Sequence, residues 1–139
     1  MKVLIDTNVI LDFLLRREPY YVNAAKINIL SEKEFICGYI SASAVTDIFY
    51  VAKRELKNKD TVLALIKNIL KTTHIVAVRE SSIYEALDLE WSDFEDSVQY
   101  TAGQSISVNY IITRNPKDFA SGYIETVTPE EFLNKVITW

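Results

Sequence analysis

Aspartates recur in this chain where a predicted strand ends or a predicted helix begins. Asp6 directly follows the apolar run at 3–5, and Asp118 lies in a turn after the last long predicted strand. Asp47, Asp93 and Asp96 fall in the first turns of predicted helices, the last two one turn apart on one face. Strand ends and helix starts share one edge of a parallel α/β sheet, which is where ligands bind in such folds. We therefore expect these acids to meet in one pocket that requires cations, and oxygen ligands suit Mg²⁺ or Mn²⁺.

Each acid also has an ordinary structural explanation, which the sequence alone leaves open. Asp6 and Asp93 are good N-caps for the helices that follow them. Asp47 and Asp96 are negative charges in a first helical turn, where they complement the helix dipole. Asp118 reads equally well as a solvated turn residue.

The predicted elements alternate between strands and helices along the whole chain. Strands are expected at about 3–5, 35–40, 74–78, 109–113 and 125–127. Helices are expected at about 8–16, 19–30, 41–56, 62–70, 81–89 and 92–107, with a last one from Pro129. A turn is predicted at 114–118. This alternation predicts an α/β fold with a mostly parallel sheet covered on both faces.

Length and composition are those of one globular domain spanning residues 1–139. The single cysteine, Cys37, suits a reducing compartment, and no apolar stretch approaches the ~20 residues of a membrane span. The N-terminus leads straight into a strand, so we expect no signal peptide and a cytoplasmic protein. A net charge of −4 argues against a large basic nucleic-acid footprint, although bound cations would present positive charge to a phosphate.

Other catalytic chemistries find little support. His74 and Cys37 are interpreted as structural, and the sequence has neither a phosphate-binding Gly-x-x-x-x-Gly-Lys loop nor a Ser-His-Asp arrangement. Transfer through an aspartyl phosphate is disfavoured because Asp6 is followed by Thr-Asn rather than by x-Asp. The middle strands, which end at Ile40 and Val78, also lack an acceptor acid.

Four segments, in order, resemble the PIN-domain nucleases, and among them the VapC-like toxins of toxin–antitoxin pairs: Val-Leu-Ile-Asp6-Thr-Asn, Ser-Ala-Ser-Ala-Val-Thr-Asp47-Ile, Asp93-Phe-Glu-Asp96 and Ile-Thr113-Arg-Asn-Pro-Lys-Asp118-Phe. The resemblance implies a three-layer α/β/α sandwich and a Mg²⁺- or Mn²⁺-dependent endoribonuclease. Asp6, Asp47 and Asp96 carry over as metal-site acids. The chain departs from the family at Asp47, where Glu is more usual, and at Asn115, where Asp is frequent.

The implied reaction is hydrolysis of an RNA phosphodiester by water activated on a cation between Asp6 and Asp96. A second cation would lie about 3.5–4 Å away and stabilise the leaving oxygen. Asp118 is expected to supply the charge that Asn115 lacks, which makes it a fourth catalytic acid. Secondary or substrate contacts are assigned to Asp93, Thr113, Arg114 and Asn115, and Lys117 is expected with Arg114 on the RNA backbone.

Asn115 also leaves an alternative open, in which a weakened PIN module binds RNA or another protein without cutting. Under the toxin interpretation, the chain has an RNA substrate and a small antitoxin protein as its partner, and a homodimer is common in the family. The RNA target cannot be derived, because phosphate contacts position a nucleic acid without reading its bases.

Overall fold

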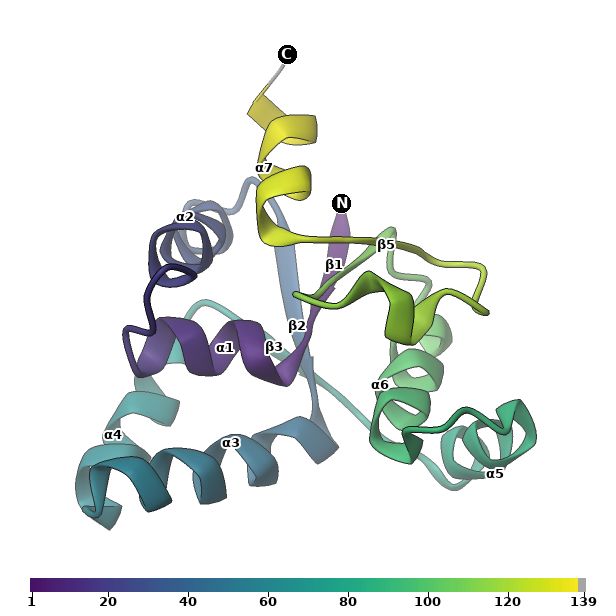
Figure 1. Cartoon of the computed structure of the whole chain (residues 1–139), viewed down its shortest axis with the longest axis horizontal. Coiled ribbons are helices and arrows are strands. Elements are labelled where there is room, and N and C mark those ends of the chain that lie inside the picture. The colour runs from purple at the N-terminus through teal and green to yellow at the C-terminus, as the bar shows by residue number, and fades with distance from the viewer. Residues whose placement is uncertain (138–139) are drawn as a thin grey trace.

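Residues 1–137, which the computed structural model describes, form a five-stranded sheet with helices on both faces (Figure 1). The strands are β1 (Lys2–Ile5), β2 (Cys37–Ser41), β3 (His74–Val76), β4 (Tyr110–Ile112) and β5 (Glu125–Val127). Their order is β3-β2-β1-β4-β5, and every described pair is parallel. The α/β/α architecture predicted from the sequence is thus confirmed.

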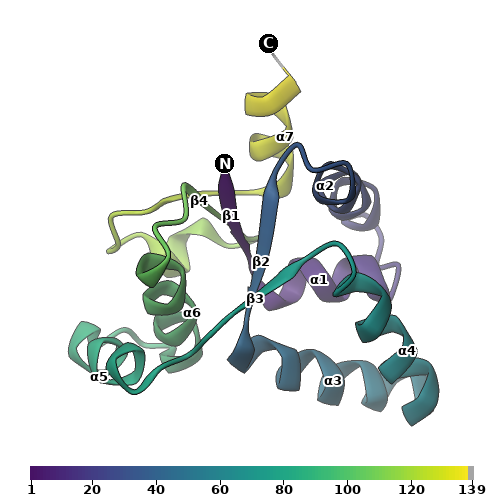
Figure 2. The same ribbon diagram turned by 180° about the vertical axis from the view of Figure 1, so that it is seen from behind.

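The helices divide between the two faces of the sheet, as Figures 1 and 2 show from opposite sides. The larger layer consists of α1 (Thr7–Leu14), α2 (Tyr21–Glu32), α3 (Ala42–Leu56), α4 (Lys59–Ile69) and α7 (Pro129–Ile137). The smaller layer consists of α5 (Glu80–Leu89), α6 (Phe94–Ser105) and the short 3₁₀ helix η1 (Pro116–Phe119). None of the helices in the described chain is long and apolar enough to cross a membrane.

Alternating side chains of the central strand divide the interior into two cores. Val3 and Ile5 point into the core beneath α1, α2, α3, α4 and α7, whereas Leu4 points into the core beneath α6 and η1. All three are 2% exposed or less, as expected for a central parallel strand covered on both faces. Gly103 allows α6 close to β1, because a Cβ there would lie 3.1 Å from a Leu4 methyl.

The observed boundaries differ from the predicted ones by a few residues, for local reasons. The strand expected at 35–40 begins at Cys37, because the Phe35 and Ile36 amides still donate to the Leu30 carbonyl and complete the turn that ends α2. The strand expected at 74–78 ends at Val76, which is paired with Ser41, where β2 gives way to α3. The predicted turn at 114–118 overlaps η1, which runs from Pro116 to Phe119.

Candidate active site

Asp6 is the first residue after the central strand, and its carboxylate is buried at the carboxyl edge of the sheet. It occupies the N-cap position of α1, but within the described chain its side chain forms no capping hydrogen bond. Instead, Thr113 Oγ1 donates to Asp6 Oδ2 over 2.8 Å, and Gln99 Nε2 donates to Oδ1 over 3.0 Å. The residue that follows β4 and a residue of α6 therefore orient the carboxylate, which argues against a role for this side chain in capping α1.

Burial raises the pKa of Asp6, and the hydrogen bonds from Thr113, Gln99 and the Thr7 amide oppose that rise. The negative charge of Asp118 raises the pKa further. The two side-chain donors, Thr113 and Gln99, are each 1% exposed, so buried hydrogen bonds hold the carboxylate in one orientation.

Asp96 lies in the first turn of α6 and faces the same region. Burial, followed by the charges of Asp93, Asp6 and Asp118, raises the pKa of Asp96 to about 7. Asp93 caps α6 by accepting a hydrogen bond from the Asp96 amide over 3.1 Å, as its ordinary structural explanation predicted. The repulsion among these acids indicates negative charge that the protein itself leaves uncompensated.

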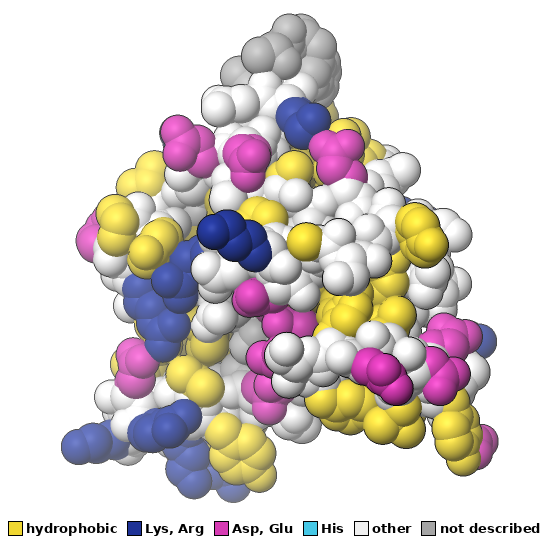
Figure 3. Space-filling model, turned by 45° about the vertical axis from the view of Figure 1, so that its right-hand side comes forward, with side chains coloured by type: hydrophobic (Ala, Val, Ile, Leu, Met, Phe, Trp, Pro, Cys, Tyr) yellow, Lys and Arg dark blue, Asp and Glu magenta, His cyan; other side chains and the backbone are white. Residues whose placement is uncertain are grey.

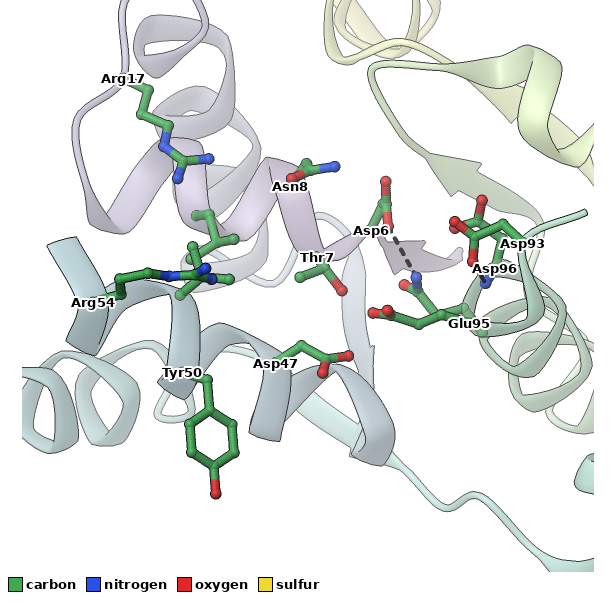
Figure 4. A pocket seen from close by; sticks show the side chains of 13 residues that line it. Asp6, Thr7, Asn8, Arg17, Asp47, Tyr50, Arg54, Asp93, Glu95 and Asp96 are labelled. Atoms are coloured by element: carbon green, nitrogen blue, oxygen red, sulfur yellow. Dashed lines mark hydrogen bonds between the residues drawn. The ribbon is translucent and has the colours of Figure 1, made fainter.

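Two cavities adjoin at these acids. The first, which we call the α3 cavity, has a volume of about 380 Å³ and opens between α1, α3 and α6 (Figure 4). The second, the η1 cavity, has about 420 Å³ and opens between α6 and η1. Asp93 and Asp96 line both cavities, Asp6 lines the first and Asp118 the second.

Asp47 reaches the α3 cavity from the opposite wall to Asp96 (Figure 4). Because α3 begins at Ala42, Asp47 lies in the second turn of that helix, and its predicted place in the first turn is wrong. Its partner is Glu95, a residue that sequence reasoning missed. A hydrogen bond to Asp47, then burial and the charges of Asp47, Asp93 and Asp96, raise the pKa of Glu95 to about 8. The Glu95 carboxyl group thus faces Asp47 across the α3 cavity and couples Asp47 electrostatically to α6 (Figure 4).

Arg114 and Asn115 do not join the acids, although both were assigned to substrate contacts. The Arg114 guanidinium lies 2.9 Å from a carboxylate oxygen of Asp12, which is 1% exposed, and 4.1 Å from the centroid of the Tyr20 ring. The backbone amide of Asn115 donates to Thr113 Oγ1 over 3.2 Å. Asn115 lines a different cavity together with Arg114 and Tyr20. Lys117 and Asp118, by contrast, both line the η1 cavity beside Asp96.

Gln99 and Glu95 escaped the sequence analysis for different reasons. Gln99 lies one turn after Asp96 on α6, so its spacing carried a signal that it shares the face of that acid. Glu95 is adjacent to Asp96, and neighbouring helical residues point in different directions. Only the packing of α3 against α6 makes the side chain of Glu95 face the α3 cavity.

The carboxylate oxygens around Asp96 are ligands of the kind that a hard divalent cation prefers. Among residues 1–137, Lys and Arg form ion pairs with Asp12, Glu55 and Glu125 but with none of the acids around Asp96. In the same residues, no three His, Cys, Asp or Glu side chains are arranged so that they could hold a metal ion by themselves. Mg²⁺ is usually held by one or two carboxylates, with water and substrate phosphate completing its shell. Asp6 and Asp96, which both line the α3 cavity, could supply such a pair of carboxylates.

Comparisons with known proteins agree with this geometry. A family model described as "PIN domain" matches residues 2–117. The chain is 28% identical to Ribonuclease VapC1 of Aquifex aeolicus, with 96% of this chain and 94% of that protein covered.

Two solved structures are similar in fold. The first is Mycobacterium tuberculosis VapC20, described as a sarcin-ricin loop cleaving toxin, with a TM-score of 0.71 at 11% identity, covering 88% of this chain and 97% of that one. The second is VapBC2 of Rickettsia felis, bound to a DNA fragment from its promoter, with a TM-score of 0.69 at 14% identity. That match covers 91% of this chain and 97% of the other.

Proposed function

The chain belongs to the PIN-domain family, and from that premise we propose that it is a Mg²⁺- or Mn²⁺-dependent endoribonuclease, the toxin of a toxin–antitoxin pair. The observation that carries the proposal is the meeting of Asp6, Asp96 and Asp118, which come from separate segments and repel one another at the open edge of the sheet. The relative named Ribonuclease VapC1, which matches over nearly its whole length, supports the choice of RNA as substrate.

Asp6 and Asp96 would hold the cation, with Asp118 adding negative charge from η1. When bound, such an ion makes water a stronger nucleophile and offsets charge on the phosphate. The residues of the chain provide the orientation. Thr113 and Gln99 fix both oxygens of Asp6, and Glu95 faces Asp47 from α6.

Basic residues near the acids support an approach path for a phosphate backbone. Arg17 and Arg54 line the far end of the α3 cavity, and Lys117 lines the η1 cavity. Figure 3 shows acidic side chains in the hollow of this face and Lys and Arg side chains gathered beside them, toward α3 and α4. An RNA strand crossing the acids would thus have a cation on either side, which positions phosphates without reading sequence.

Cleavage of mixed single-stranded RNAs tests the enzymatic proposal. We expect internal cuts with Mg²⁺ or Mn²⁺, none with chelator, and none from Asp6→Asn or Asp96→Asn. Asp88→Asn, an exposed residue on α5, is the matched control and should cut normally. Metal-independent cutting, or full activity of either active-site variant, would contradict the mechanism.

Growth measurements test the toxin proposal separately. Expression of the chain alone should slow growth, and Asp6→Ala should relieve the effect. Co-expression of a small antitoxin protein should relieve it as well, since an arginine of such a partner can neutralise the acids bidentately. If the protein cuts RNA in vitro but its expression is harmless, the nuclease proposal stands and the toxin proposal is contradicted.

A further inference from the structure

The η1 cavity contains an aromatic wall that the proposed chemistry does not use. Trp91 lies in the loop between α5 and α6 and is partly buried, and it lines this cavity with Lys117. Asp93, Asp96 and Asp118 line the same cavity. An indole and an ammonium group thus share one space of about 420 Å³ with acids of the candidate active site.

Two buried rings hold the indole in place. The ring of Trp91 lies 5.0 Å from that of Tyr100 and 5.9 Å from that of Phe119, centroid to centroid. Both neighbours are at most 2% exposed, and the Tyr100 hydroxyl is itself fixed by the Tyr123 amide, which donates to it over 2.7 Å. Because Tyr100 is on α6 and Phe119 on η1, the same two elements position both Trp91 and the acids.

We propose that Trp91 is a stacking platform for one nucleobase of single-stranded RNA, next to the phosphate that the acids act on. The inference rests on the proposed function and adds a substrate-binding residue to it. Single-stranded RNA is recognised largely by stacking of its unpaired bases on aromatic side chains. A fixed ring loses little conformational freedom when a base binds, which favours affinity.

The surroundings of Trp91 favour a nucleotide over a purely apolar ligand. Lys117 offers a cation to the phosphate that joins the stacked base to the next nucleotide. The acids that line the same cavity would repel that phosphate unless a divalent cation lay between them. Stacking at Trp91 would therefore set which phosphate of the strand lies beside Asp96.

Tryptophan emission tests the contact directly. The chain has two tryptophans, so Trp139→Phe leaves Trp91 as the only reporter. A ten-nucleotide single-stranded RNA, added with Mg²⁺ and followed by stopped flow before it is cut, should quench this emission to saturation. This measurement keeps the indole in place and so does not depend on how a Trp91 variant folds.

Binding of the same RNA, fluorescently labelled, gives the magnitude. Stacking on an aromatic residue corresponds to a loss of roughly 5- to 150-fold in affinity on substitution by alanine. We expect Trp91→Ala to lose affinity in that range, and Trp91→Phe to lose less because it retains a ring. Tyr84→Ala on α5, where the ring is 61% exposed and outside both cavities, should bind like the native protein.

The outcomes separate the two proposals. RNA that binds without changing Trp91 emission, or a folded Trp91→Ala variant that binds as tightly as the native protein, would overturn the stacking role. If that variant also cuts RNA normally, the nuclease stands and only this inference fails. If the native chain neither binds nor cuts RNA, both proposals fall.

Discussion

Asp96 is an acid whose ionised form is disfavoured by burial and by neighbouring negative charges, so replacing it with a neutral side chain should stabilise the protein. We predict that Asp96→Asn raises the free energy of unfolding in chelator at pH 8, although it abolishes cleavage. Asparagine has the same shape but removes one charge from the group that Asp96 forms with Asp93, Asp6 and Asp118. The Asp96 amide, which donates to Asp93, is unaffected by the change.

The size of the effect follows from the raised pKa. A folded-state pKa of about 7 for Asp96, against the ordinary value of 3.8, corresponds to about 4 kcal/mol at 1.36 kcal/mol per pKa unit. Partial exposure of Asp96 screens these charges, which reduces the value to about 2 kcal/mol. Losing a negative charge from the first turn of α6 costs roughly 0.5 kcal/mol. A net gain of about 1–2 kcal/mol remains, or roughly 4–8 °C in Tm for a chain of this size.

The stabilisation by Asp96→Asn should depend on pH in a direction that follows from the raised pKa. Because the folded-state pKa of Asp96 is raised, the folded protein binds the proton more tightly than the unfolded chain. The destabilisation of the native protein by ionised Asp96 is therefore absent below the unfolded pKa of 3.8, grows as the pH rises, and is complete above about pH 7. The advantage of Asp96→Asn over the native protein should shrink as the pH falls from 8 to 4.

Urea unfolding in chelator at several pH values measures this difference. Asp88→Asn, with its side chain exposed on α5, is the matched control and should differ little from the native protein at any pH. If Asp96→Asn is destabilised at pH 8, or if its advantage does not depend on pH, Asp96 does not lie in a cluster of mutually repelling acids. The assignment of a cation to Asp6 and Asp96 would then lose its physical basis.

Three further outcomes are expected. Millimolar Mn²⁺ should raise Tm in thermal scans, because a ligand at a hundredfold excess over its Kd stabilises the folded protein by about 2.7 kcal/mol. Asp6→Asn should reduce that rise. Asp118→Ala should raise the Mg²⁺ concentration needed for half-maximal cleavage, whereas Asn115→Asp should change it little, because Asn115 lines a separate cavity. Asp12→Ala should lower the unfolding free energy by about 2–3 kcal/mol in urea titrations, since it leaves the partly buried Arg114 guanidinium without its carboxylate.

The local pattern of the chain determined the sheet, its parallel strands and the edge where the acids lie. Periodicity and capping residues depend on near neighbours in sequence, so the strand before Asp6 and the helix before which Asp93 stands could be read without a structure. The same reasoning placed Asp96 at the carboxyl edge of the sheet, in the first turn of its helix.

Only the tertiary structure decided which side chains meet. Gln99 and Asp6 are 93 residues apart, and their hydrogen bond exists because α6 packs against β1. Glu95 finds Asp47 across the α3 cavity, and Arg114 is drawn to Asp12 on α1 rather than toward the acids. Such contacts depend on how whole helices and strands pack, which no local pattern of residues encodes. The helix that carries a side chain sets its direction, but the elements packed against that helix decide which residues it meets.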